Sequence, residues 1–266
     1  MDKEQIKKLA GNPNFIKGIY NYCDRWCERC PFTSRCMNFA LADEQFPDQE
    51  SHDIDNEAFW HKLSEIFRVT LDLVKETAEQ AGIDLDAINT EETAEKERLN
   101  GEIVRSHECC RMAKAYAKMV DNCFDSLEGA PGHKENDLTF KARVEILNAD
   151  PLQETDNCEN AVEVIRWYQH QIYVKLMRAI RGILEEKDEP PDEFAKDSDG
   201  SAKVALIGID RSIAAWGEIR TCFFAYESEI LDILVHLERL RRNVEKVFPD
   251  ARAFIRPGFD KVDLNS

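Results

Sequence analysis

Four of the nine cysteines in this chain lie close together near its start. Cys23, Cys27, Cys30 and Cys36 are separated by three, two and five residues. Thiolates bind metals, and four of them can close a tetrahedral zinc site or hold the corners of a [4Fe–4S] cluster. The alternatives are free cysteines that only pack, or disulfides, which are typical of secreted chains. Because nothing marks the chain as secreted, the spacing favours a metal centre.

The local sequence predicts how these four sulfurs are positioned. If residues 21–29 are helical, Cys23, Cys27 and Cys30 stand at positions i, i+4 and i+7 and share one face. Pro31 would then end the helix, because the residue before a proline is pushed out of the α region. The turn that follows can bring Cys36 back toward that face. We therefore expect three ligands from a helix and one from a loop.

The residues between the cysteines suit the surroundings of such a centre. Four thiolates around one metal centre form a local anion, and Arg29 can offset that charge together with Arg25 and Arg35. Trp26 and Phe32 are large and apolar, so they can keep water away from the centre. We predict Trp26, Arg29 and Phe32 as the residues that surround the cofactor.

The run from Cys27 to Cys36 has the pattern C-x2-C-x5-C, with Pro31 and Phe32 directly after Cys30. This pattern resembles the cluster loop of iron–sulfur DNA glycosylases, and it is similar to the C-terminal cysteine cluster of iron–sulfur nucleases of the RecB type. The resemblance covers about ten residues and implies a [4Fe–4S] cluster. Zinc is the alternative, although zinc fingers usually set two cysteine pairs well apart. No DNA-binding hairpin or nuclease motif accompanies the pattern, so the resemblance implies the cluster chemistry and not the DNA activity.

The length, charge and cysteine content of the whole chain limit which classes of partner are expected. It has 266 residues and a formal net charge of −17, so it repels phosphate backbones and is not expected to bind nucleic acid. No apolar run reaches the ~18 residues of a membrane span, and the N-terminus does not read as a signal peptide. Nine cysteines without export indicate a reducing cytoplasm. We expect a protein partner, and the sequence leaves the oligomeric state open.

Apolar residues recur at helical spacing through most of the chain. The predicted helices are 57–82, 91–127, 138–147, 156–186 and 201–248, the last of which Gly217 could kink or split. Long amphipathic helices joined by polar loops predict an all-α fold, a bundle of four to five long helices with a small N-terminal four-cysteine metal-binding cap. The expected domains are the cysteine-rich cap at 1–45, the helical bundle at 56–248 and a C-terminal tail at 249–266.

Two other groups of residues could in principle carry chemistry. Acidic residues and histidines that could build a di-iron site in a helical bundle fall off the apolar stripes, which argues against such a site. Cys109 or Cys110 with His107 could form a nucleophilic pair, but a cysteine on an apolar stripe more often packs as a small hydrophobe. The sequence therefore assigns no catalytic residue and leaves open whether the protein is an enzyme. It predicts a metal-binding scaffold module, with an iron–sulfur redox protein or redox enzyme as the alternative.

Overall fold

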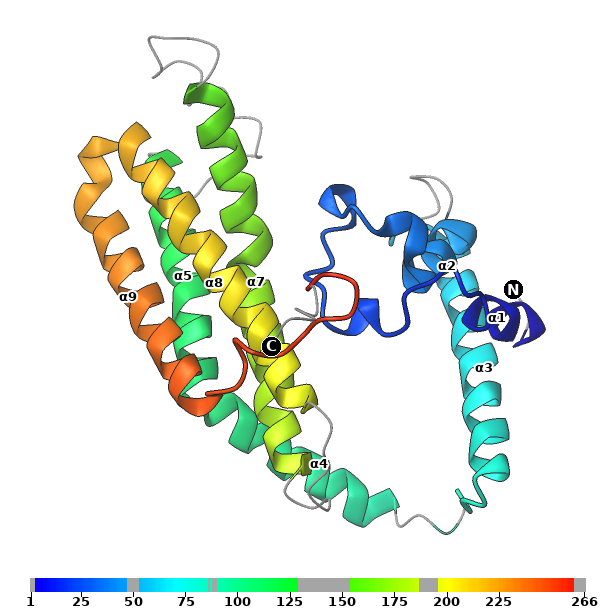
Figure 1. Cartoon of the computed structure of the whole chain (residues 1–266). Helices are drawn as coiled ribbons and strands as arrows, with labels where there is room; N and C mark the ends of the chain where they lie inside the picture. Colours follow the sequence, from blue (N-terminus) through cyan, green and yellow to red (C-terminus); the bar gives the residue numbers. More distant parts are fainter. Residues whose placement is uncertain are drawn as a thin grey trace, which may run out of the picture. The chain divides into compact units, whose positions relative to one another are not determined.

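The computed structural model describes residues 3–46, 53–85, 87, 90–128, 154–186 and 196–260. Within these residues every regular element is helical and no strand occurs, so the predicted all-α class is confirmed (Figure 1). The α-helices are α1 (Lys3–Ala10), α2 (Met37–Gln45), α3 (Glu57–Gln80), α4 (Thr90–Ser106), α5 (Glu108–Glu128), α7 (Glu154–Glu186), α8 (Asp197–Cys222) and α9 (Glu227–Val247). None of these helices is both long and apolar enough to cross a bilayer.

The chain divides into two compact units. The first unit comprises Met1–Arg98 and Arg256–Ser266, and the second unit comprises Leu99–Ile255. One division therefore falls inside α4 and the other directly after Ile255. The cysteine segment belongs to the first unit and the long C-terminal helices belong to the second. The predicted boundaries at residues 45, 56 and 248 and the number of helices in the bundle stay predictions.

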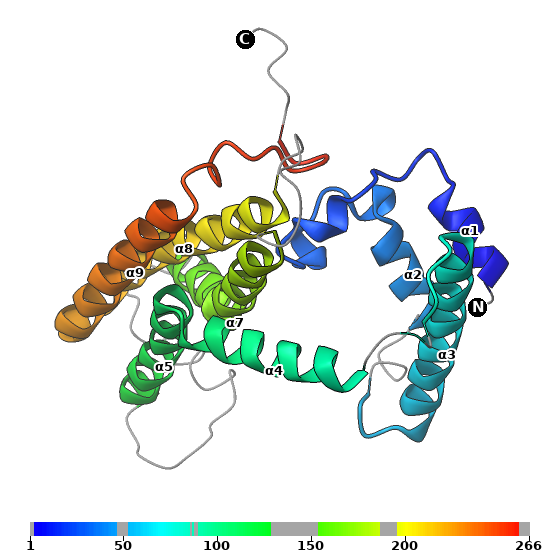
Figure 2. The same cartoon turned by 90° about the horizontal axis from the view of Figure 1, so that it is seen from below.

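Among the described residues of the second unit, helices α5, α7, α8 and α9 contact one another in a ring. α7 packs against α5 and α8, and α9 packs against the same two neighbours (Figures 1 and 2). Trp216 is fully buried at its centre, stacks on Phe124 at 5.6 Å between ring centroids, and donates a hydrogen bond from Nε1 to Tyr116 Oη at 3.2 Å. Each large apolar side chain buried in this way contributes about 1.5–3 kcal/mol.

The apolar stripe expected along α7 forms part of this core. Its most buried members are at most 3% exposed; they are Cys158, Ile165, Gln169, Ile172, Leu176, Ala179 and Ile180. Gln169 is polar, but its amide is satisfied because Nε2 donates to the Ala117 carbonyl oxygen at 3.0 Å. The helical spacing of this segment therefore predicted both the element and the side that it buries.

Two predicted helices are each divided in the structure. The helix expected over 91–127 breaks at His107, whose Nδ1 accepts a hydrogen bond from the Cys109 backbone N–H at 3.2 Å and so caps α5. The segment 201–248 forms α8 and α9, joined by the 3-10 turn η5 (Phe224–Tyr226), while Gly217 lies inside α8. The short helix predicted over 138–147 lies outside the described residues.

The first unit places α1 and α2 against α3. Asn56 caps α3, since its Oδ1 accepts a hydrogen bond from the Ala58 N–H at 2.9 Å. Glu76 of α3 forms ion pairs with Lys7 and Lys3 of α1, with nitrogen–oxygen distances of 2.5 and 4.0 Å. These ion pairs join α1 to α3, and all four N-terminal cysteines lie in the segment between α1 and α2.

Candidate metal centre

The cysteine segment consists of tight turns, so the helix predicted over 21–29 is wrong. Its regular elements are the 3-10 turns η1 (Ile19–Asn21), η2 (Cys27–Arg29) and η3 (Thr33–Arg35). Arg25 has φ of 61°, which a right-handed helix does not allow. The chain turns here because the Trp26 N–H donates to Asp24 Oδ1 at 3.3 Å and the Cys27 N–H donates to the Arg25 carbonyl oxygen at 3.0 Å.

These turns position the cysteines one by one. Cys23 follows η1, and its thiol donates a hydrogen bond to the Tyr20 carbonyl oxygen at 3.5 Å. Cys27 begins η2 and Cys30 ends it, with the Cys30 N–H donating to the Cys27 carbonyl oxygen at 3.1 Å. Cys36 ends η3 and precedes α2. Successive turns, and not the expected helical face, therefore position the four sulfurs.

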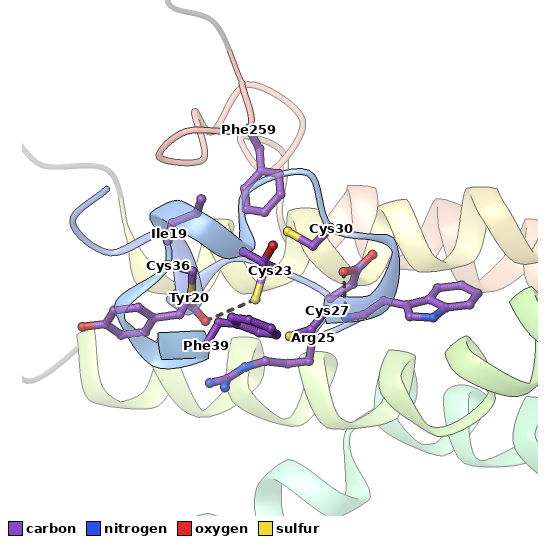
Figure 3. Close-up of a pocket in the computed structure, with 12 residues that line it drawn as sticks. Ile19, Tyr20, Cys23, Arg25, Cys27, Cys30, Cys36, Phe39 and Phe259 are labelled. Carbon is purple, nitrogen blue, oxygen red and sulfur yellow. Dashed lines mark hydrogen bonds between the residues drawn. The ribbon is translucent and has the colours of Figure 1, made fainter. Parts of the chain in front are cut away.

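All four cysteines line one pocket. Figure 3 shows them around it, with Phe259 and Phe39 on opposite sides of the group in this view. Every one of the four side chains is half-buried. The rest of the lining is mostly apolar, and the cavity measures about 20 Å³. The structure thus brings together the four residues that the sequence predicted as metal ligands.

The electrostatics of the pocket reflect this proximity. Burial raises the pKa of the Cys27 thiol above its ordinary value of 9.0, and Cys23, Glu28, Cys30 and Cys36 raise it further in that order. Because burial is the main cause, a thiolate at Cys27 is costly in this pocket, and negative charge on its neighbours adds to that cost unless a cation compensates it. A bound metal would supply that cation and would release the protons of the thiols that it binds.

The three predicted surrounding residues lie at different places around the pocket. Trp26 lines it directly. Arg29 does not line it, but its guanidinium carbon lies 4.1 Å from the centroid of the Trp26 ring, within reach of a cation–π interaction. Phe32 packs edge-to-face on Phe259, with 5.2 Å between the ring centroids. Only Trp26 of the three therefore touches the space where a metal centre would sit.

Sequence reasoning missed the contribution of the C-terminal residues. Phe259 lines the cysteine pocket, although it lies in the segment expected to be a tail. Gly258 makes this approach possible: its φ is 78°, and a Cβ at this position would come within 2.9 Å of Ile16. Arg256 lies over the Phe259 ring at 4.8 Å and forms an ion pair with Asp260 at 3.0 Å. The Pro257-Gly258 pair signals a turn, but no local pattern indicates what the turn packs against.

The sulfurs are near one another without forming a finished coordination site. Within the described residues, no group of three or more His, Cys, Asp or Glu side chains is arranged to hold a metal ion. Binding would require the four thiols to turn toward a common point. The thiol of Cys23 would give up its hydrogen bond to Tyr20 on losing its proton, which frees that sulfur to rotate.

Three cysteines of the second unit are in a different environment. Cys109, Cys110 and Cys123 are at most 4% exposed, and burial raises their pKa to about 11, 12 and 11 respectively. His107 uses Nδ1 to cap α5, and burial lowers its pKa. Thiols with such pKa values are poor nucleophiles, so packing explains these three residues better than catalysis does. A disulfide joins Cys158 of α7 to Cys222 of α8, with their Cα atoms 6.9 Å apart.

The chain matches no protein-family model, no curated protein and no solved structure. Its function has to be inferred from the chemistry of its own residues. The cysteine pocket is the part of the described chain where reactive groups of one kind gather from several turns.

Proposed function

We propose that Cys23, Cys27, Cys30 and Cys36 bind one metal centre, a [4Fe–4S] cluster or a zinc ion, and that the protein is a binding or scaffold module with this centre as its N-terminal cap. The observation that carries the proposal is that all four thiols line a single, largely apolar pocket. Soft thiolate donors select zinc and iron–sulfur clusters over magnesium or calcium. The apolar lining would exclude water and competing ligands.

The turns also support metal binding over simple packing. A cysteine that only packs is usually buried, whereas these four are half-buried. Cys27, Cys30 and Cys36 stand at or beside an end of a short 3-10 turn, and Cys23 stands two residues after one, so none of them lies inside a regular helix. A structural zinc site contributes on the order of 10 kcal/mol to folding, so loading would stabilise a segment that has few regular hydrogen bonds of its own.

Zinc and a [4Fe–4S] cluster need different amounts of space in the cysteine pocket. A cavity of about 20 Å³ has room for about one ion or water molecule. A cluster brings four irons and four sulfides, so the turns would have to open further for it than for zinc. The compressed spacing of the cysteines favours the cluster, because zinc sites usually use two separated pairs. The volume of the pocket therefore favours zinc, whereas the spacing of the cysteines favours the cluster.

One experiment tests the proposal and separates the centres. The full chain is expressed, purified without oxygen, and assayed for iron, zinc and sulfide alongside its absorbance near ~400 nm. A colourless protein with one zinc per chain supports the zinc centre, and a brown protein with matching iron and sulfide supports the cluster. A protein that contains neither, and takes up neither on reconstitution, overturns the proposal.

An iron–sulfur redox protein is the second candidate function. The half-buried position of the four cysteines favours it, because electron transfer needs a centre near the surface. Trp26 and the nearby arginines would tune the potential through shielding and charge. Reversible bleaching with dithionite would support this candidate. A centre that is colourless, or that dithionite leaves unchanged, would remove it.

A further inference from the structure

One side of α3, the long helix of the first unit, exposes a row of large apolar side chains, which we call the α3 seam (Figure 1). Its members are 52–61% exposed; they are Trp60, Phe67, Leu71 and Val74. The seam extends about 21 Å along the helix axis. It is separate from the side of α3 where the Phe59 ring packs on Phe46, the residue after α2, with 5.6 Å between the ring centroids. Contiguous apolar surface outside the core is typical of an interaction site.

The spacing of the seam indicates the kind of structure that covers it. Steps of four and three residues alternate along it, through Trp60, Ser64, Phe67, Leu71, Val74 and Ala78. A seven-residue repeat of this kind keeps one row of side chains facing a neighbouring helix along its length. Ser64 is compatible with the repeat, because its hydroxyl already donates to the Trp60 carbonyl oxygen at 2.8 Å. The expected occupant is therefore another α-helix.

Trp60 is held in place although it is exposed. Its Nε1 donates a hydrogen bond to the Ile54 carbonyl oxygen at 2.7 Å, and its ring packs edge-to-face on Phe59 with 5.2 Å between the centroids. A side chain that is already fixed loses little further freedom on binding, and tryptophan is enriched among the residues that dominate binding energy. The N-terminal end of the seam is thus preorganised for a partner.

Basic side chains flank one edge of the seam. His61, Arg68 and Lys75 recur there every seven residues, are exposed, and form no ion pair within the described part of the chain. The acidic row of α3 lies farther round the helix, roughly 100–140° from the centre of the seam; it holds Glu65, Asp72 and Glu79. The other edge is uncharged; it holds Leu63, Thr70 and Thr77. A helix that lies on the seam would therefore meet positive charge along one edge.

This charge pattern argues against a second copy of the chain as the occupant. Two antiparallel copies of α3 would bring their basic edges together, and two parallel copies would set each basic edge against the uncharged one. Neither arrangement pairs opposite charges. A different helix with Glu or Asp along its facing edge would pair with the whole basic row, and such complementarity selects partners.

We propose that the α3 seam binds an amphipathic helix of a partner protein, one with an apolar heptad row and an acidic edge. The apolar row would cover the seam, and the acidic edge would lie beside His61, Arg68 and Lys75. The proposal is independent of the metal centre, because no residue of the seam or of its basic edge lines the cysteine pocket.

The direct test titrates the full chain with two synthetic helical peptides of about four heptads, a length at which isolated helices begin to be stable. Both carry leucine at the two seam positions of each heptad; one carries glutamate and the other lysine at the flanking positions. Calorimetry should show saturable binding of the acidic peptide and at least about tenfold weaker binding of the basic one, because its lysines would face the basic row. The net charge of −17 attracts the basic peptide, so a preference for the acidic one reports the local row.

Charge reversal tests the basic edge. Arg68→Glu combined with Lys75→Glu should invert the preference, so that the basic peptide binds more tightly than the acidic one. Arg242→Glu combined with Lys246→Glu is the matched control, since it changes the net charge equally at exposed positions of α9 and should leave the acidic peptide preferred. A reversed α3 edge that still prefers the acidic peptide would overturn the proposal.

Truncation tests the seam itself. Phe67→Ala combined with Leu71→Ala should weaken binding of the acidic peptide at least about tenfold, because most of the buried apolar area is lost. Leu231→Ala combined with Val235→Ala, at residues of α9 that are 40% and 48% exposed, should leave it unchanged. Circular dichroism checks that every variant keeps its helices.

Three results would overturn the proposal. The first is an acidic peptide that shows no saturable binding at about 1 mM, and the second is equal affinity for the two peptides. The third is a dimer in analytical ultracentrifugation that Phe67→Ala with Leu71→Ala dissociates, because a second copy would then be the occupant of the seam.

Discussion

The two units treat their cysteines in opposite ways. In the second unit Cys109, Cys110 and Cys123 lie on α5, are almost completely buried, and act as small apolar side chains in a helical core. In the first unit the four N-terminal cysteines stand at the ends of short turns, half-buried and lining a common pocket. The contrast shows that the residue type alone does not reveal a site. Convergence from irregular backbone distinguishes a candidate ligand from a packing residue.

Replacing one of the four N-terminal cysteines should abolish metal binding, whereas replacing a cysteine of α5 should not. Cys27→Ser is expected to reduce the metal content from one centre per chain to none, because three thiolates leave the site open. Residues 3–46 should become sensitive to protease, while the helical circular dichroism of α5, α7, α8 and α9 persists. Metal analysis and limited proteolysis check this.

Cys123→Ala is the control, because Cys123 does not line the cysteine pocket. It should keep the full metal content. A Cys27→Ser protein that still holds a complete centre would contradict the assignment of Cys27 as a ligand.

Thiol labelling compares the N-terminal cysteines with those of α5 without any mutation. Cys109, Cys110 and Cys123 are at most 4% exposed, and burial raises the pKa of Cys110 to about 12, which keeps it protonated at pH 8. Cys23, Cys30 and Cys36 are half-buried, so iodoacetamide should modify them in metal-free protein well before Cys109, Cys110 or Cys123. Mass spectrometry of timed samples gives the order. Fast labelling of Cys110 in folded protein would show that α5 opens readily.

A pair of glycines in α8 tests how tightly the second unit is packed. A Cβ on Gly208 would lie 2.8 Å from the Tyr168 ring, whereas a Cβ on Gly217 would meet nothing within 4 Å. Gly208→Ala should therefore lower the free energy of unfolding by about 1–3 kcal/mol. Gly217→Ala, its control on the same helix, should raise it by about 0.5–1 kcal/mol. Chemical denaturation measures both, and equal effects from the two changes would contradict the packing described for Tyr168.

The sequence predicted the second unit better than the first for a physical reason. An apolar stripe such as that of α7 repeats at the helical period, so the pattern itself contains the element and its buried face. The break at His107 was missed, and a break within 201–248 was considered only at Gly217, because apolar residues continue on both sides of each actual break. The turns of the cysteine segment were missed because the same cysteine spacing fits a helix. The left-handed conformation of Arg25 could not be predicted either, because arginine, unlike glycine, rarely adopts it. The contact of Phe259 with this segment is non-local, so no window of sequence contains it.

Phe259 gives the smallest and most specific effect. Its ring covers the cysteine pocket and packs on Phe32, so Phe259→Ala would open the centre to water and chelator without removing a ligand. We expect the metal content to stay complete and the rate of loss to a chelator to rise several-fold, because the apolar shell controls access. Ile255→Ala is the control, since Ile255 is 48% exposed and lines no part of this pocket. Unchanged loss rates in Phe259→Ala would mean that the ring does not shield the centre, and a lost centre would mean that the C-terminal segment helps to hold the four turns in place.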